Sequence, residues 1–316
     1  MLSVLYLVVG IVLILWGADK LTDGATGIAR RFRINELVIG LTVVALGTSL
    51  PEFVVSFTAT LQGTSGISIG NIMGSNIFNI LVIVGVTAMV SPIVVSKGTI
   101  QKDVPFAILS SAALMVMSMD ALWGVDEMNW LSRGDGLVLL MFFAVFMAYT
   151  FSIASNDELR DEQPTTQMSY TKIGLYVLLG LAGLIFGGKL FVNGATDIAL
   201  SLGMSETVVG LTIVAAGTSL PELATSVVAA RKGSSSIAIG NVIGSNLFNV
   251  FFVLGFCSTI SPMPIGEISN LDLGLLLMCP VLLWLFSASK RKVERWEGAV
   301  LFLIYIAYTA YLIWKS

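Results

Sequence analysis

Ten long apolar stretches follow one another along the chain, and they constrain its fold more than any other feature. They are 2–28, 35–62, 67–91, 101–120, 131–154, 170–200, 206–231, 236–260, 271–289 and 294–314. A helix needs about 20 apolar residues to cross a bilayer. The stretches are continuously apolar, whereas the strands of a membrane barrel alternate polar and apolar residues. We therefore predict an all-α polytopic membrane protein with ten transmembrane helices.

The composition agrees with a membrane protein and excludes several other classes. Hydrophobic residues make up 56% of the chain and charged residues 12%, whereas a soluble domain carries about a quarter charged residues. Histidine is absent, and Cys257 and Cys279 lack the spacing of metal ligands. The net charge of −3 does not suggest a nucleic-acid partner. The first stretch lacks the basic segment and cleavage site of a signal peptide, so we interpret it as a span.

The basic residues indicate the orientation, because cytoplasmic loops carry an excess of lysine and arginine. With both termini outside, thirteen of the 17 lysines and arginines lie inside. They are Arg30, Arg31, Arg33, Lys97, Lys102, Arg160, Lys172, Arg231, Lys232, Lys290, Arg291, Lys292 and Arg295. We predict a multi-pass protein of the plasma (inner) membrane with both termini outside.

The two halves of the chain repeat each other. After a shift of 170 residues, positions 40–85 and 210–255 are identical at 25 of 46 places. The first half, 1–154, and the second half, 170–316, each contain five spans, and 155–169 forms a short cytoplasmic linker loop. Because five is odd, the second half enters the membrane from the opposite side. Such inverted-topology repeats are typical of secondary transporters.

Glu52 and Glu222 lie inside apolar spans, at the same place in each repeat. An ionised carboxylate at the bilayer centre costs roughly 3 kcal/mol on insertion scales, so it normally faces a cavity, a partner or an ion. The basic residues nearest to either in its span are Arg231 and Lys232, at the inner end. A bound cation would remove the repulsion between the two carboxylates. The alternative is a pair of protonated glutamates that form hydrogen bonds between helices.

Each glutamate ends a GTSLPE motif whose other residues supply oxygen atoms. Pro51 and Pro221 interrupt their helices, and a broken helix in mid-membrane is tolerated where its free carbonyls line a wet cavity. Thr48 is four residues from Glu52, as Thr218 is from Glu222, which predicts a shared helix face. The serines of the two motifs add hydroxyl groups: Ser49 and Ser219.

A second doubled motif, GNxxGSNxFN, adds a polar stripe to the next span of each repeat. The stripes are Asn71, Ser75 and Asn79, and Asn241, Ser245 and Asn249. The GxxxG glycines of this motif favour close helix packing. As an alternative to ion binding, the stripes could hold helices together by hydrogen bonds. Carboxylate, carbonyl, hydroxyl and amide oxygens suit calcium and sodium, whereas soft metals prefer sulfur or imidazole. The residues thus predict a transporter of hard cations with a midplane site between the repeats.

The paired motifs resemble the two alpha-repeats of the sodium/calcium exchanger family, within the calcium/cation antiporter superfamily. The likeness covers the whole chain and indicates a minimal prokaryotic form, because the linker is too short for large regulatory domains. The resemblance implies a calcium site at Glu52 and Glu222 with the backbone oxygens of Thr48 and Thr218. It also implies surrounding sodium sites and completing ligands at Ser49, Ser75, Ser219, Ser245, Asn79, Asn249 and the carbonyls of Ala45 and Ala215.

The family pattern also bears on ion selection and on movement. Some members, including the potassium-dependent branch, carry aspartate at the place of Asn249, so asparagine here argues against potassium transport and leaves two formal negative charges. The family implies alternating access, in which the first and sixth spans slide across the remaining core. Lys20 and Lys189 lie in these spans, close in sequence to Asp19, Asp23 or Asp197. They form either local ion pairs or part of the gate.

We expect a sodium/calcium antiporter that is not an enzyme, needs no cofactor and works as a monomer in the bilayer. A proton/calcium exchanger is the nearest alternative, because glutamates can carry protons. A passive cation channel would also suit broken helices and carboxylates. An intramembrane enzyme with two carboxylates as acid and base is the remaining alternative.

Overall fold

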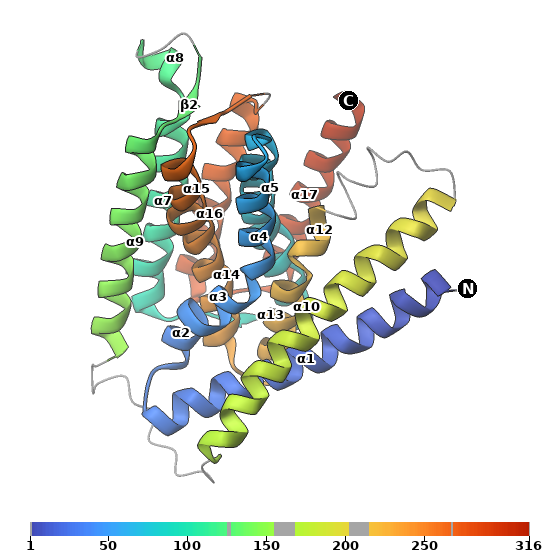
Figure 1. The fold of residues 1–316 in the computed structure, drawn as a ribbon. Helices are drawn as coiled ribbons and strands as arrows, with labels where there is room; N and C mark the ends of the chain where they lie inside the picture. The colour runs from blue at the N-terminus through green and yellow to red at the C-terminus, as the bar shows by residue number, and fades with distance from the viewer. Residues whose placement is uncertain (1, 125–127, 155–167, 202–214, 267, 316) are drawn as a thin grey trace.

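Helices occupy all ten of the predicted stretches (Figure 1). The computed structural model describes residues 2–124, 128–154, 168–201, 215–266 and 268–315, so 206–214 of the predicted seventh span and 155–167 of the linker lie outside it. Seven of the described helices are long and apolar enough to cross a membrane. The bent pair Glu36–Thr48 and Leu50–Leu61 adds an eighth span if it is counted as one. The all-helical membrane fold predicted from the sequence is confirmed.

The helices of the first half include three stretches of π-helix, written η. Their order is α1 (Leu2–Phe32), α2 (Glu36–Ile39), η1 (Gly40–Val44), α3 (Ala45–Thr48), α4 (Leu50–Leu61), α5 (Ser65–Phe78), η2 (Asn79–Val84), α6 (Gly85–Val90), β1 (Ile93–Val94), η3 (Thr99–Asp103), α7 (Val104–Met117), α8 (Asp120–Trp123), β2 (Trp130–Leu131) and α9 (Arg133–Ala154). The π-helical stretches are not predictable from apolar periodicity, because they keep the same residue types.

The second half follows the same plan. Its described elements are α10 (Tyr170–Ser201), α12 (Ala215–Thr218), α13 (Leu220–Arg231), α14 (Ser235–Leu247), η6 (Phe248–Leu254), α15 (Gly255–Ile260), β3 (Met263–Pro264), α16 (Asn270–Lys290), β4 (Lys292–Val293) and α17 (Arg295–Lys315). The π-helix η6 begins at Phe248, within one residue of the position that matches the start of η2 at Asn79, so both stand at the end of the GSNxF segment. The two halves therefore share local geometry as well as sequence.

Two spans form the centre of the molecule, and they carry the predicted polar stripes. The apolar window of the span Gly66–Val90 is 83% buried, and that of Ser235–Ile260 is 94% buried. The corresponding windows of α1 and α10 are only 22% and 28% buried. Apolar side chains on the outside face lipid rather than water, as for Val12 and Leu178. Polar groups on the two central spans must instead find partners inside the protein.

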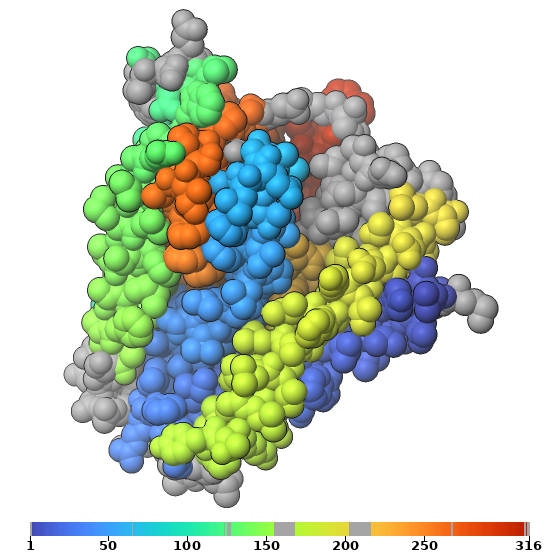
Figure 2. All heavy atoms as spheres, viewed as in Figure 1, coloured from blue at the N-terminus to red at the C-terminus, as the bar shows by residue number. Residues whose placement is uncertain are grey.

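Helices α1 and α10 lie side by side as a long antiparallel pair across one side of the remaining helices (Figures 1 and 2). Their backbones touch at glycines. A Cβ atom added to Gly10 would lie 2.6 Å from the backbone nitrogen of Phe191, and one added to Gly187 would lie 2.8 Å from that of Ile14. Small residues allow such close approach between membrane helices. The pair is therefore tightly joined to itself, while most of its surface faces outward.

Two short antiparallel ribbons connect loops that are distant in sequence. In one, β1 pairs with β4, with Ile93 opposite Val293. In the other, β2 pairs with β3, with Leu131 opposite Met263. The first ribbon joins two loops that the basic residues predict to lie inside. The second joins two loops predicted to lie outside, so both pairings agree with the predicted order of spans.

The glycines of the second motif have different surroundings in the two halves. A Cβ atom at Gly240 would lie 2.8 Å from the carbonyl oxygen of Leu37, and one at Gly244 would lie 2.7 Å from that of Leu41. The packing role predicted for this pair is confirmed. At Gly70 and Gly74, no atom of the described residues lies within 4 Å of such a Cβ. The residues of the second repeat that match α2 and η1 are 206–214, and they lie outside the described residues.

Candidate cation-binding site

Both GTSLPE motifs break their helix at the serine. Ser49, between α3 and α4, has φ −85° and ψ 7°, and Ser219, between α12 and α13, has φ −91° and ψ 6°. The helices on either side of Ser49 are bent by 48°. The proline falls in the first turn of the following helix, where a missing N–H costs nothing. Thr48 and Glu52 thus lie on opposite sides of a break, so continuous helical spacing does not pair them.

Glu52 and Glu222 stand in the first turns of α4 and α13 and are both buried. Each is 1% exposed, so neither side of the membrane reaches them directly in this arrangement. No ion pair to either carboxylate is found within the described part of the chain. Two buried carboxylates without a basic partner need protons or cations to offset their charge.

Serines from opposite repeats hold the two carboxylates. The Oγ of Ser49 donates to Oε1 of Glu222 across 2.9 Å, and the Oγ of Ser219 donates to Oε1 of Glu52 across 3.1 Å. Ser75 adds a long contact of 3.5 Å to Oε1 of Glu52, and its Oγ lies 3.2 Å from Oγ of Ser219. The serine and glutamate of both GTSLPE motifs therefore meet in one place, although the bonded partners are 173 and 167 residues apart in sequence.

The first asparagine of each stripe supports the helix that carries the glutamate. The Nδ2 of Asn71 donates to the carbonyl oxygen of Glu52 across 3.3 Å and to Oγ of Ser56 across 3.0 Å. The Nδ2 of Asn241 makes the equivalent contacts in the other repeat, to the carbonyl of Glu222 at 3.3 Å and to Ser226 at 3.0 Å. These asparagines satisfy backbone and hydroxyl groups, which fits the hydrogen-bonding role that the sequence left open.

The last asparagine of each stripe, Asn79 or Asn249, is 1% exposed and forms its hydrogen bond with the opposite repeat. The Nδ2 of Asn79 donates to Oδ1 of Asn246 at 2.9 Å, and the Nδ2 of Asn249 donates to Oδ1 of Asn76 at 3.0 Å. Sequence reasoning overlooked Asn76 and Asn246, although both belong to the doubled motif. That doubling was the signal that could have identified them.

The other predicted residues lie at the helix breaks. Thr48 Oγ1 lies 3.2 Å from Oδ1 of Asn241 and 3.4 Å from the carbonyl oxygen of Ala45, which is itself buried. In the second repeat, Ala215 begins α12 and Thr218 ends it. These threonines and alanines thus flank the serines that hold the carboxylates.

Five of the ten buried side-chain oxygens that lack a hydrogen-bond partner among the described residues belong to this cluster. They are Glu52 Oε2, Glu222 Oε2, Asn79 Oδ1, Asn249 Oδ1 and Ser245 Oγ. A buried oxygen without a partner is costly, so these atoms fit a cation ligand. The described residues contain no group of three histidine, cysteine, aspartate or glutamate side chains that could hold a metal ion. A cation here must therefore rely on amide, hydroxyl and carbonyl oxygens beside the two carboxylates.

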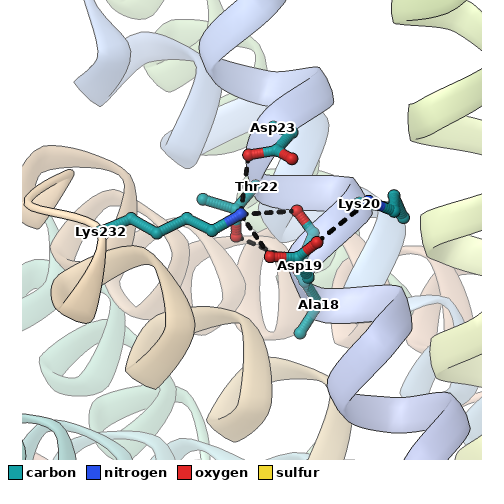
Figure 3. A network of polar contacts seen from close by, with 6 residues as sticks. All are labelled: Ala18, Asp19, Lys20, Thr22, Asp23 and Lys232. Atoms are coloured by element: carbon teal, nitrogen blue, oxygen red, sulfur yellow. Dashed lines mark hydrogen bonds and ion pairs between the residues drawn. The ribbon is translucent and has the colours of Figure 1, made fainter.

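A second polar network connects α1 to the turn between α13 and α14 (Figure 3). The Nζ of Lys232 lies 2.6 Å from Oδ1 of Asp19 and 2.7 Å from Oδ1 of Asp23, and Lys20 lies 3.1 Å from Oδ2 of Asp19. Burial lowers the pKa of Lys232, but hydrogen bonds to the two aspartates outweigh it and raise that pKa overall. The local Lys20 pair predicted from the sequence is present, whereas Lys232 was recognised only as a loop charge.

A cavity of about 260 Å³ lies beside this network. It is lined by Asp23, Thr26, Gly27, Arg30, Arg31, Met168, Lys232 and Ser234. None of its lining residues belongs to the buried carboxylate cluster. The carboxylates themselves are enclosed by side chains, which is consistent with an ion site closed to both faces.

The family model for sodium/calcium exchanger proteins matches residues 2–152 and 172–314, which is nearly the whole chain. The chain belongs to the sodium/calcium exchanger family. It is thus a multi-pass membrane transporter and not an enzyme. The match leaves out 153–171, which contains the whole of the predicted linker, 155–169.

Individual relatives of this exchanger are similar over their full length. The sodium/calcium exchanger MaX1 of Methanosarcina acetivorans is 32% identical, over 98% of this chain and 97% of the relative. The inner membrane protein YrbG of Escherichia coli is 34% identical, over 100% and 98%. The solved structure of the exchanger NCX_Mj, soaked with Na⁺ and Ca²⁺, has a TM-score of 0.85 at 36% identity and covers 98% of both chains. The exchanger therefore shares its ten-helix inverted-repeat fold with NCX_Mj.

Proposed function

We propose that this exchanger is an antiporter that moves sodium in one direction and calcium in the other through one shared site. The observation that carries the proposal is the pair Glu52 and Glu222, each held by a serine of the opposite repeat. Both carboxylates keep one oxygen without a partner among the described residues. Two fixed negative charges enclosed in a membrane suit one divalent cation, or sodium ions that share the same carboxylates.

We propose a calcium position between Glu52 and Glu222, with the backbone oxygens of Thr48 and Thr218. The sodium positions surround it and use the four serines, Ser49, Ser75, Ser219 and Ser245, with the carbonyls of Ala45 and Ala215. Asn79 and Asn249 complete the ligand set. The burial of the described ligands and their contacts between repeats support this assignment. So does the relationship to NCX_Mj, whose structures were soaked with Na⁺, Ca²⁺ and Sr²⁺.

Exchange follows from competition for the shared carboxylates. Calcium and a full set of sodium ions both need Glu52 and Glu222, so one must leave before the other binds completely. An empty site with two buried, unneutralised charges is costly to move across the apolar core. Reorientation is therefore favoured only with an ion load, and this couples the two fluxes. We assign the movement to the α1–α10 pair, which slides against the remaining helices. The small buried fraction of that pair supports this assignment.

We further propose that the protein resides in the inner membrane with both termini outside, and that one copy is sufficient for transport. The inner-membrane relative YrbG supports the location. The two β-ribbons support the order of spans, since each joins loops assigned to the same side, and the excess of lysine and arginine in the loops assigned to the inside supports the orientation. All proposed ligands come from one chain, which supports a working monomer.

The deciding experiment is calcium uptake into proteoliposomes loaded with sodium. We expect uptake with a sodium gradient and no uptake for Glu222→Gln. Uptake driven by a pH gradient alone would instead support proton/calcium exchange. Calcium flux that needs no counter-ion would support a channel.

A further inference from the structure

Four buried asparagines form a closed set of hydrogen bonds between the two central spans. We call Asn76, Asn79, Asn246 and Asn249 the amide ring. Asn76 Nδ2 donates to the carbonyl oxygen of Asn246 at 3.1 Å, and Asn246 Nδ2 donates to that of Asn76 at 3.3 Å. Each side chain of the ring is at most 4% exposed. The ring therefore ties the α5–η2 junction to the α14–η6 junction by direct hydrogen bonds.

The orientation of all four amides follows from these two contacts. A backbone carbonyl can only accept, so the side-chain atom that reaches it must be the nitrogen. Oδ1 of Asn76 then faces Asn249, and an oxygen there requires the nitrogen of Asn249 as donor, at 3.0 Å. By the same reasoning, Oδ1 of Asn246 requires the nitrogen of Asn79, at 2.9 Å. The order of O and N in each amide is thus fixed by the network rather than chosen freely.

With the amides in this orientation, two side-chain amide oxygens of the ring accept no hydrogen bond from the described residues. Oδ1 of Asn79 and Oδ1 of Asn249 are buried and have no partner among the residues that the structure describes. Asn79 follows Ser75 by one helical turn, and Ser75 contacts Glu52. The Nδ2 atom of each of these two amides donates to the opposite repeat instead. If an amide rotated, its N–H would replace the oxygen and would repel a cation.

We propose that Asn76 and Asn246 are positioning residues, which hold Asn249 and Asn79 so that only their carbonyl oxygens are offered to the transported cation. The inference rests on the proposed function, because it assumes that Asn79 and Asn249 are ligands. It adds a division of labour within the doubled motif. The third asparagine in GNxxGSNxFN binds the ion, and the second sets its direction from the other repeat.

The arrangement predicts which pairs of residues depend on each other. The substitution Asn76→Ala removes the hydrogen bond to Asn249 but leaves the one between Asn79 and Asn246. Asn246 is held by the backbone oxygen of Asn76, which the substitution keeps. Coupling should therefore join Asn76 with Asn249 in the opposite repeat. It should not join Asn76 with Asn79, although these two are three residues apart on one helix.

The test measures equilibrium binding of radioactive calcium to the purified full-length protein in detergent. We expect Asn76→Ala and Asn246→Ala each to weaken calcium binding about tenfold, as for a lost hydrogen bond that orients a ligand. The double variant of Asn76→Ala with Asn249→Ala should bind like Asn249→Ala alone. The double variant of Asn76→Ala with Asn79→Ala should show the product of the two single effects. In proteoliposomes, Asn76→Ala should raise the half-saturating calcium concentration and change the maximal rate less.

Three outcomes would overturn the proposal. One is independent effects for Asn76 with Asn249, and another is unchanged binding in Asn76→Ala while the unaltered protein binds and transports calcium. Either would leave the proposed function standing. The third is that neither Asn76→Ala nor Asn246→Ala yields folded protein, which would make the ring a purely structural element. An unaltered protein that binds no calcium would instead contradict the proposed function, and this inference with it.

Discussion

Ser49 donates a hydrogen bond to Oε1 of Glu222 across 2.9 Å, and the two residues belong to opposite repeats. The reverse bond, from Ser219 to Glu52, is 3.1 Å long. Each glutamate is therefore oriented by the helix break of the other half. The symmetry is incomplete, because Glu52 also contacts Ser75, whereas the matching Ser245 Oγ has no partner among the described residues.

The serine contacts lead to a first prediction about affinity. We expect Ser49→Ala to weaken calcium binding roughly tenfold, because a hydrogen bond to a charged group contributes about 1.5–3 kcal/mol and part of this loss can be recovered by relaxation. Ser219→Ala should do the same through Glu52. Equilibrium calcium binding to purified protein measures both. Ser110→Ala is a suitable control, since Ser110 is buried but bonds only to the carbonyl of Ala107 in its own helix.

The carboxylates lead to a second prediction, about coupling. We expect Glu52→Gln to weaken calcium binding on the order of a hundredfold and to abolish sodium-driven uptake, because the protein loses one of the two negative charges that bind the divalent ion. The fold should persist, since the glutamine oxygen can still accept from Ser219. Calcium uptake and thermal unfolding should be measured on the same preparation. Full uptake by this variant would remove Glu52 from the proposed site.

Much of this molecule could be predicted from the sequence because two signals are local and strong. The apolar stretches identify every span whose residues are described, and the doubled motifs identify the carboxylates and serines that meet. A membrane core allows few alternatives to helices, so hydropathy constrains the fold more than it does in water.

The remaining features depend on contacts between distant residues. The amide ring was overlooked because asparagines in a membrane helix look alike until their partners are known. The contact of Lys232 with Asp19 joins residues 213 positions apart, and nothing in the local sequence indicates it. The π-helices η2 and η6 were also not predicted, since helical periodicity does not reveal a local change in hydrogen bonding.

A buried tyrosine–aspartate bond leads to a third prediction, about stability. Tyr149 on α9 donates to Oδ1 of Asp103 across 2.9 Å, and Asp103 is fully buried with Oδ2 lacking a partner among the described residues. Tyr149→Phe would leave a buried carboxyl group with fewer partners. We expect a loss of about 1–3 kcal/mol in the free energy of unfolding. Thermal unfolding in detergent tests this, with the exposed Tyr311→Phe as control; equal melting temperatures for the two variants would contradict it.

The network of Lys232 leads to a fourth prediction, about the α1–α10 pair (Figure 3). Lys232 contacts Asp19 and Asp23 on α1, so it stabilises the present position of that helix against the core. The three side chains are 31% to 42% exposed, which limits the contribution to about 1 kcal/mol. Lys232→Met should therefore shift the balance between the two access states by up to about fivefold. The measurement is the ratio of half-saturating calcium concentrations on the two faces of oriented proteoliposomes, with Lys292→Met as control, since Lys292 pairs with Glu294 and not with α1.

The same residue determines how this effect depends on pH. The pKa of Lys232 is raised above its ordinary value of 10.5, so the charged contact is complete below that value and is lost only as the pH rises through the raised pKa. Between about pH 6 and pH 9 the lysine stays charged. The difference between Lys232→Met and the unaltered protein should therefore stay constant over this range. A difference that vanishes as the pH rises from 6 to about 9 would show that Lys232 does not hold α1 through its charge.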